Sequence, residues 1–120
     1  MGALASCGRG RFSATDTRLA LAMASPRARC IVAHEVGGGT AGSAPYAPDT
    51  VGDGGTSFGV AQLHDSHGTD AGAGDGLLSD FYRRGYADPF DPYQAVAYLD
   101  DALDRGLARH WSPVKRGLCP

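Results

Sequence analysis

Glu35 is the only glutamate in a chain of 120 residues, and it lies in the last turn of a predicted helix that ends at Gly37-Gly38-Gly39. A helix C-terminus presents unsatisfied carbonyl groups, whose negative potential disfavours a carboxylate, and partial burial in a cleft disfavours it further. Both effects raise the pKa of a carboxyl group. A carboxylic acid that stays protonated near neutral pH can donate a proton to a glycosidic oxygen. Glu35 is therefore a candidate general acid, and the alternative is an exposed glutamate at a helix end.

A second group of polar residues lies in the segment 51–63, which has the sequence VGDGGTSFGVAQL. Asp53 stands in a turn where Gly54-Gly55 suits a tight change of direction. Gly59 lets the chain pass close to a ligand or to another backbone segment. The flat amide of Gln62 offers two donors and an acceptor, which suit the N-acetyl and hydroxyl groups of a sugar. The segment indicates a sugar-binding turn and strand, with the alternative that Asp53 only bonds its own backbone.

Together these elements resemble the catalytic region of goose-type lysozymes and soluble lytic transglycosylases, above all their compact phage and actinobacterial versions. The family pattern is a glutamate at a helix end, then a glycine-rich stretch, then a Gly-Leu-Met-Gln-like strand. The corresponding residues here are Glu35, Gly52-Asp53 and the segment 58–62, FGVAQ. The segment 88–99, DPFDPYQAVAYL, is similar to the family helix that packs under the active site. The resemblance covers about residues 26–111 and rests on several linked elements in order.

The resemblance implies cleavage of the β-1,4 bond between N-acetylmuramic acid and N-acetylglucosamine in peptidoglycan glycan strands. Glu35 would donate the proton, and Asp53 would hold the attacking water of a hydrolase. An inverting hydrolase needs its two carboxyl groups roughly 6.5–9.5 Å apart, whereas a lytic transglycosylase needs one carboxyl group that acts first as acid and then as base. The candidate sugar contacts are Gln62, Ser57, Tyr46, His64 and Tyr86.

This sequence departs from the family pattern at several places. Val36 stands where the family usually has serine, Ala61 replaces the usual methionine, and His64 stands where goose-type enzymes often have another aspartate. The family's Tyr/Asn-Gly segment near the C-terminus is missing, which puts the far wall of the groove in question. These departures keep open a non-catalytic alternative, a glycan-binding or virion structural module of the same fold.

The histidines suggest another alternative, a metal-dependent hydrolase that uses His34, His64 and His67. His34-Glu35 begins like the helix of a zinc protease, but Gly38 occupies the place of the second histidine, so that motif fails. We therefore expect neither a metal ion nor a cofactor.

Composition limits the remaining function classes. The length fits one domain, and a net charge of −2 gives no electrostatic footprint for nucleic acid. No apolar stretch is long enough to insert into a membrane, and we expect a monomer. The N-terminus lacks the pattern of a secretory signal, so the route to the cell wall would be a phage particle, a holin pore or a larger exported protein.

The helices and strands expected from the sequence must position these residues. They indicate a mainly α, α+β lysozyme-like domain with at most a short β-hairpin. Residues 1–14 are expected to be a disordered tail and residues 15–120 the catalytic domain. Thr15 or Asp16 can cap a first helix to about Ala24, and Ser25 with Pro26 starts the helix that carries Glu35. The segment 56–63 can pair as a hairpin arm, and a short helix is expected near residues 77–84.

The clearest helix begins at Asp91 and Pro92, where Asp91 caps and Gln94 can complete a capping box. Apolar residues then recur at helical spacing and predict a core face, with Trp111 closing the core behind it. They are Val96, Leu99, Ala102, Leu103 and Leu107.

Three cysteines, Cys7, Cys30 and Cys119, form no recognisable disulfide framework. Cys30 lies in an apolar run and is expected to be a buried small hydrophobic residue. A bridge between Cys7 and Cys119 remains open.

Overall fold

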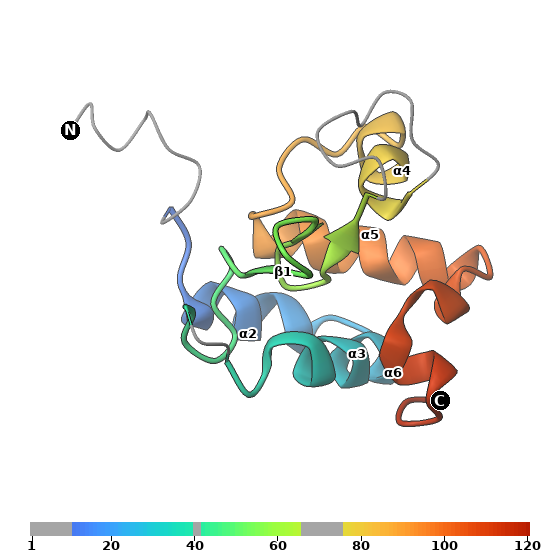
Figure 1. Cartoon of the computed structure of the whole chain (residues 1–120), viewed down its shortest axis with the longest axis horizontal. Coiled ribbons are helices and arrows are strands. Elements are labelled where there is room, and N and C mark those ends of the chain that lie inside the picture. The colour runs from blue at the N-terminus through green and yellow to red at the C-terminus, as the bar shows by residue number, and fades with distance from the viewer. Residues whose placement is uncertain (1–10, 40–41, 66–75) are drawn as a thin grey trace.

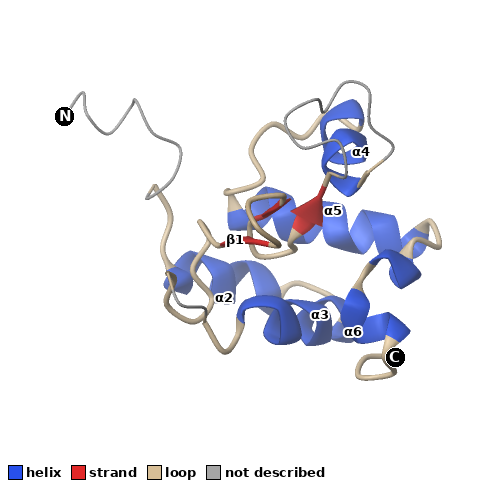
Figure 2. Ribbon diagram, viewed as in Figure 1, coloured by secondary structure: helices blue, strands red, loops and turns tan. Residues whose placement is uncertain are grey.

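The computed structural model describes residues 11–39, 42–65 and 76–120 of the chain. It confirms a mainly helical fold with a short three-stranded antiparallel sheet (Figures 1 and 2). Most of the predicted tail, together with Cys7 and His67, lies outside the described residues. In chain order the elements are α2 (Ala14–Ala22), α3 (Pro26–Val36), β1 (Val51–Gly52), β2 (Ser57–Phe58), β3 (Leu63–His64), α4 (Leu77–Arg83), α5 (Pro92–Asp104), the 3-10 helix η2 (Ala108–His110) and α6 (Ser112–Lys115).

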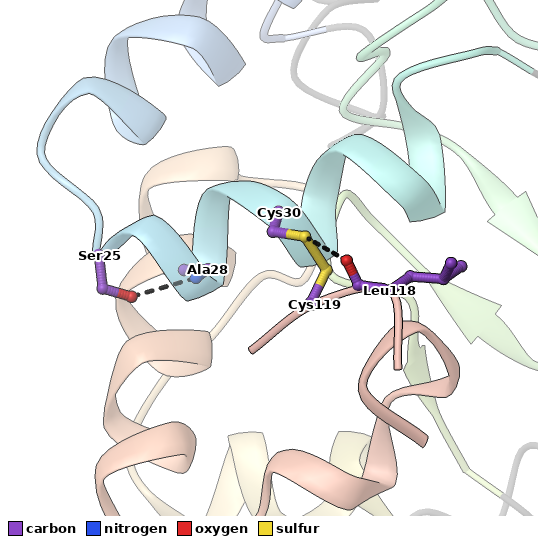
Figure 3. Close-up of a disulfide and its surroundings, with 5 residues drawn as sticks. All are labelled: Ser25, Ala28, Cys30, Leu118 and Cys119. Carbon is purple, nitrogen blue, oxygen red and sulfur yellow. Dashed lines mark hydrogen bonds between the residues drawn. A yellow bond between two sulfur atoms is a disulfide. The ribbon is translucent and has the colours of Figure 1, made fainter. Parts of the chain in front are cut away.

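Two helices start where the sequence predicts. The Ser25 hydroxyl accepts the Ala28 N–H at 3.1 Å at the start of α3 (Figure 3), and the Asp91 carboxylate accepts the Tyr93 N–H at 2.9 Å at the start of α5. Each cap satisfies a backbone donor that has no partner within the helix. The prediction for Gln94 is wrong, because its side-chain oxygen accepts the Ala87 N–H at 2.7 Å instead of closing a capping box.

The first helix begins earlier than predicted. Ser13 is the N-cap of α2, and the Asp16 carboxylate reaches back to accept the Ser13 N–H at 2.9 Å. Asp16 therefore lies inside the helix, three residues after the cap, which is the position from which an acidic side chain can reach the cap backbone.

At the C-terminal end of α3, the glycine with a left-handed backbone is Gly39, with a φ of 75°, and not the C-cap Gly37.

The core forms around α5, which contacts both α2 and α3 (Figure 1). The predicted stripe on α5 is confirmed, since Val96, Leu99 and Ala102 are buried and the two later leucines pack against the same core. Trp111 is 1% exposed, and its indole N–H donates to the Ala61 carbonyl oxygen at 2.8 Å. This bond ties the chain after α5 to the segment between β2 and β3.

The sheet runs in the order β1-β2-β3, with Gly52 opposite Ser57 and Ser57 opposite His64. Asp53 opens the turn between β1 and β2 with a φ of 53°, in a left-handed region that aspartate tolerates better than most residues. Gly59 has a φ of 78°, and a β-carbon there would collide with the Pro89 carbonyl oxygen. The close approach predicted at Gly59 is thus an approach to the backbone that precedes α5.

Cys30 and Cys119 form a disulfide (Figure 3). Cys30 is therefore not the unpaired hydrophobic residue predicted from the sequence, and Cys119 is not left for Cys7. The two residues are 89 positions apart, but their Cα atoms lie 5.8 Å apart because α6 contacts α3 and carries the following segment along it. None of the helices in the described ranges has the length and apolar composition to cross a bilayer.

Breaking this bond should weaken the fold measurably. Cys119→Ser is expected to lower the free energy of unfolding by about 4 kcal/mol, because it frees a long loop in the unfolded chain. For a domain of this size that corresponds to a fall in Tm of roughly 15 °C. Thermal denaturation checks this, with Cys7→Ser as the matched control that removes the third cysteine. A Tm for Cys119→Ser within about 2 °C of the wild type would contradict the expectation.

Candidate active site

A cleft of about 640 Å³ lies beside the C-terminal half of α3. His34 and Glu35 enter it from α3, while Asp53, Ser57, Gln62 and His64 come from the sheet and its turns. The rest of its lining comes from the segment 110–116, which contains α6. The structure therefore brings Glu35 and Asp53 to one cleft, as the sequence predicted, although they are 18 positions apart in the chain (53 minus 35).

Glu35 is partly buried in this cleft. Burial raises the pKa of its carboxyl group above the usual value, the negative charge of Asp53 raises it further, and the positive charge of Arg116 acts in the opposite direction. A raised pKa keeps the carboxyl group protonated to higher pH, which is what a general acid needs. Burial and a neighbouring carboxylate are therefore the two causes that raise the pKa of Glu35 in this environment.

The Asp53 side chain is held by Ser57, four residues later in the chain. The Ser57 hydroxyl donates to the Asp53 carboxylate at 2.6 Å, and the Thr56 hydroxyl donates to the Asp53 carbonyl oxygen at 2.9 Å. The first is a short, charge-assisted bond of the stronger kind. The Asp53 side chain is thus oriented by a side chain from β2 instead of bonding its own backbone.

Ser57 also joins Asp53 to His64. Ser57 is 1% exposed, and its oxygen lies 3.2 Å from the Nδ1 atom of His64, its partner across the sheet. The Ser57 hydroxyl has one hydrogen, which points to Asp53, so the bond to His64 requires a hydrogen on Nδ1. This assignment of the ring hydrogen follows from the hydrogen-bond network. Ser57 therefore positions Asp53 and His64, a role different from the sugar contact predicted for it.

Gln62 lies in the cleft but its amide is also engaged in the fold. The side-chain N–H group donates to the Gly59 carbonyl oxygen at 2.9 Å and to the Thr50 carbonyl oxygen at 3.4 Å. The amide oxygen lies against Gly52, where a β-carbon would collide with it. The Gln62 side chain therefore stabilises the sheet beside the cleft. Its backbone is in a left-handed conformation with a φ of 48°.

Gln62→Ala should therefore lower stability, and it also tests the sugar contact that the sequence predicts for this residue. We expect a loss of about 1 kcal/mol in the free energy of unfolding, because the buried carbonyl groups of Gly59 and Thr50 each lose one of their two donors. Thermal denaturation and binding to purified glycan fragments measure the two effects separately. Gln94→Ala is the matched control, since that amide also binds backbone but lies outside the cleft. Equal glycan affinity in the two variants would limit Gln62 to its structural role.

Two predicted sugar contacts are not brought to this cleft. The Tyr46 ring lies under the Arg18 guanidinium group, 5.1 Å from it, beside α2 and α3. Tyr86 stacks on Phe81 with ring centroids 5.1 Å apart and packs against the core. Both rings pack against the fold, and neither lines the cleft that contains Glu35.

The α6 side of the cleft contains residues that the sequence did not predict for the site. His110, Lys115 and Arg116 line the cleft there, and the charge of Arg116 acts on Glu35. The only signal in the sequence was the basic pair that follows Trp111, since α6 has four residues and no periodic pattern. The Cys30–Cys119 bond that fixes this side could not be inferred from spacing.

The departures from the family pattern fall mainly in the core. Val36 is 1% exposed and Ala61 is fully buried, so neither side chain reaches the cleft. His34 and His64 do line it, whereas His67 lies outside the described residues. Comparisons of the chain with protein-family models, with curated proteins and with solved structures give no match.

Proposed function

We propose that this protein cleaves the β-1,4-linked glycan strands of bacterial peptidoglycan, with Glu35 as the catalytic acid. The observation that carries the proposal is the pairing of Glu35, whose pKa is raised, with Asp53 in one open cleft. Two carboxyl groups in different surroundings, one protonated and one ionised, are the general requirement of glycosidases. The sequence resemblance to goose-type lysozymes and lytic transglycosylases supports the same reaction.

Each residue has a defined part in this reaction. Glu35 donates its proton to the glycosidic oxygen as the bond breaks. Asp53, oriented by Ser57, holds or activates the water that attacks the sugar in a hydrolase. In a transglycosylase the sugar's own hydroxyl attacks, and Glu35 takes the proton back.

The electrostatics of the cleft support an acidic glycan as substrate. Lys115, on α6, and Arg116, which follows it, line the same cleft as the carboxylates, and the charge of Arg116 acts on Glu35. Muramic acid carries a lactyl carboxyl group to which a peptide with further carboxylates is attached, whereas a plain N-acetylglucosamine polymer carries no charge. A cationic wall favours binding of the charged polymer.

The test is incubation of the purified protein with purified cell-wall sacculi and mass spectrometry of the released material. We expect soluble disaccharide-peptide fragments whose amount grows with time. Binding to the sacculi without release would support the non-catalytic glycan-binding alternative and overturn the proposal. Chitin fragments are the matched uncharged substrate and are expected to be cleaved more slowly.

A further inference from the structure

A cluster of metal-binding side chains lies next to the carboxylate pair and plays no part in the proposed hydrolysis. Cys30 and His34 are four residues apart on α3, so they share one face of the helix. Cys119 reaches the same face from the segment after α6 (Figure 3). The two sulfur atoms and a ring nitrogen of His34 all lie within 4.8 Å of one another.

We propose that these three residues form a zinc site when the Cys30–Cys119 disulfide is reduced. Two thiolates and an imidazole are the donors that Zn²⁺ prefers. Zn–S bonds of about 2.3 Å and Zn–N bonds of about 2.0–2.1 Å in a tetrahedron place donor atoms roughly 3.5–3.8 Å apart. The imidazole nitrogen lies within 4.8 Å of both sulfurs, and the two sulfurs must move apart from their bonded distance of 2.02 Å.

The exchange between the two states is balanced. A dithiol or phosphine reductant supplies two electrons, the S–S bond breaks, and each sulfur takes up a proton. Zn²⁺ then displaces those two protons and binds both thiolates together with the neutral His34 ring. Two negative charges cancel the charge of the ion. Water takes the fourth position, which is accessible because His34 is exposed.

Because of the position of this cluster, replacement of the disulfide by a zinc ion would affect the segments that line the cleft. Cys119 is three residues after Arg116, and His34 directly precedes Glu35, so the cluster joins the helix that carries Glu35 to the segment that carries Arg116. A disulfide makes that connection under oxidising conditions. A zinc ion would make the same connection under reducing conditions, where the covalent bond is lost.

The experiment uses the full chain, reduced with a phosphine and kept free of oxygen, and Co²⁺ as a spectroscopic probe that zinc displaces. We expect one Co²⁺ per chain, with the intense thiolate-to-cobalt absorption, and loss of that absorption when Zn²⁺ is added. The oxidised protein should show no such absorption. Zinc should also raise the Tm of the reduced protein towards that of the oxidised protein.

Variants distinguish this site from nonspecific binding of the metal ion to free thiols. His34→Ala keeps both cysteines and should weaken cobalt binding at least tenfold, and His110→Ala, which alters another histidine of the cleft, should not. Cys7→Ser should bind like the wild type. The proposal is overturned if reduced wild-type protein binds Co²⁺ no more tightly than Cys30→Ser/Cys119→Ser, if His34→Ala binds as well as the wild type, or if Cys7→Ser loses binding.

Discussion

Replacement of Glu35 with glutamine is expected to abolish fragment release from cell wall while the protein stays folded. The amide has the size and shape of the protonated carboxyl group but cannot transfer a proton to the leaving oxygen. Release of soluble fragments per unit time measures the loss. If Glu35→Gln lyses cell wall at a rate near that of the wild type, Glu35 is not the catalytic acid.

The raised pKa of Glu35 adds an independent check on the same variant. A carboxyl group whose pKa is higher in the folded than in the unfolded state destabilises the fold once the pH rises above its unfolded value. Glutamine removes that penalty, so the Tm of Glu35→Gln at neutral pH should equal or exceed that of the wild type. A lower Tm would mean that the lost activity reports unfolding. In the wild type, activity should fall as the pH rises through the pKa of Glu35, because the acid is lost.

Replacement of Asp53 with asparagine separates the two possible mechanisms. If the enzyme is an inverting hydrolase, turnover should fall by roughly 10²–10⁴, the usual value of a positioned general base. The turn should survive, because asparagine also tolerates a positive φ and its oxygen can still accept the Ser57 hydroxyl. Mass spectrometry identifies the product, since a 1,6-anhydro sugar lacks one water relative to a hydrolytic end.

A lytic transglycosylase gives a different pair of results for Asp53→Asn, with little loss of turnover and an anhydro product. Hydrolytic ends together with full activity would contradict the role assigned to Asp53. Under both mechanisms the variant removes a negative charge that raises the pKa of Glu35. The alkaline limb of the pH profile should therefore move to lower pH, which shows that the two carboxyl groups share one site.

Local signals in the sequence predicted the helices that position Glu35 and close the core. Ser25 and Asp91 cap where expected because a cap depends on a side chain and a backbone donor two or three residues away. Gln94 shows the limit of such signals, since its amide oxygen accepts the Ala87 and Asp88 N–H groups of the loop before the helix and not the N–H of the cap residue.

The contacts that depend on the path of the whole chain could not be predicted in this way. Tyr46 and Tyr86 are aromatic residues in loops, and nothing in their neighbours shows which surface each loop will cover. Cys30 and Cys119 meet because α6 turns back onto α3, a long-range event without a local pattern. Glu35, Asp53 and Gln62 were predicted for one site because the chemistry of that site restricts the residue types that can serve there. The spacing of the three residues along the chain gave little information.

The Cys30–Cys119 bond also divides the chain into two linear ends and a large covalent ring. Residues 30–119 are closed into the ring, and residues 1–29 and Pro120 are each attached to it by one peptide bond. A protease that cuts once at any point within the ring opens it without separating the pieces, so the segments that line the cleft stay in one molecule. Such a nicked protein would migrate as a single species until a reductant is added, and then as two.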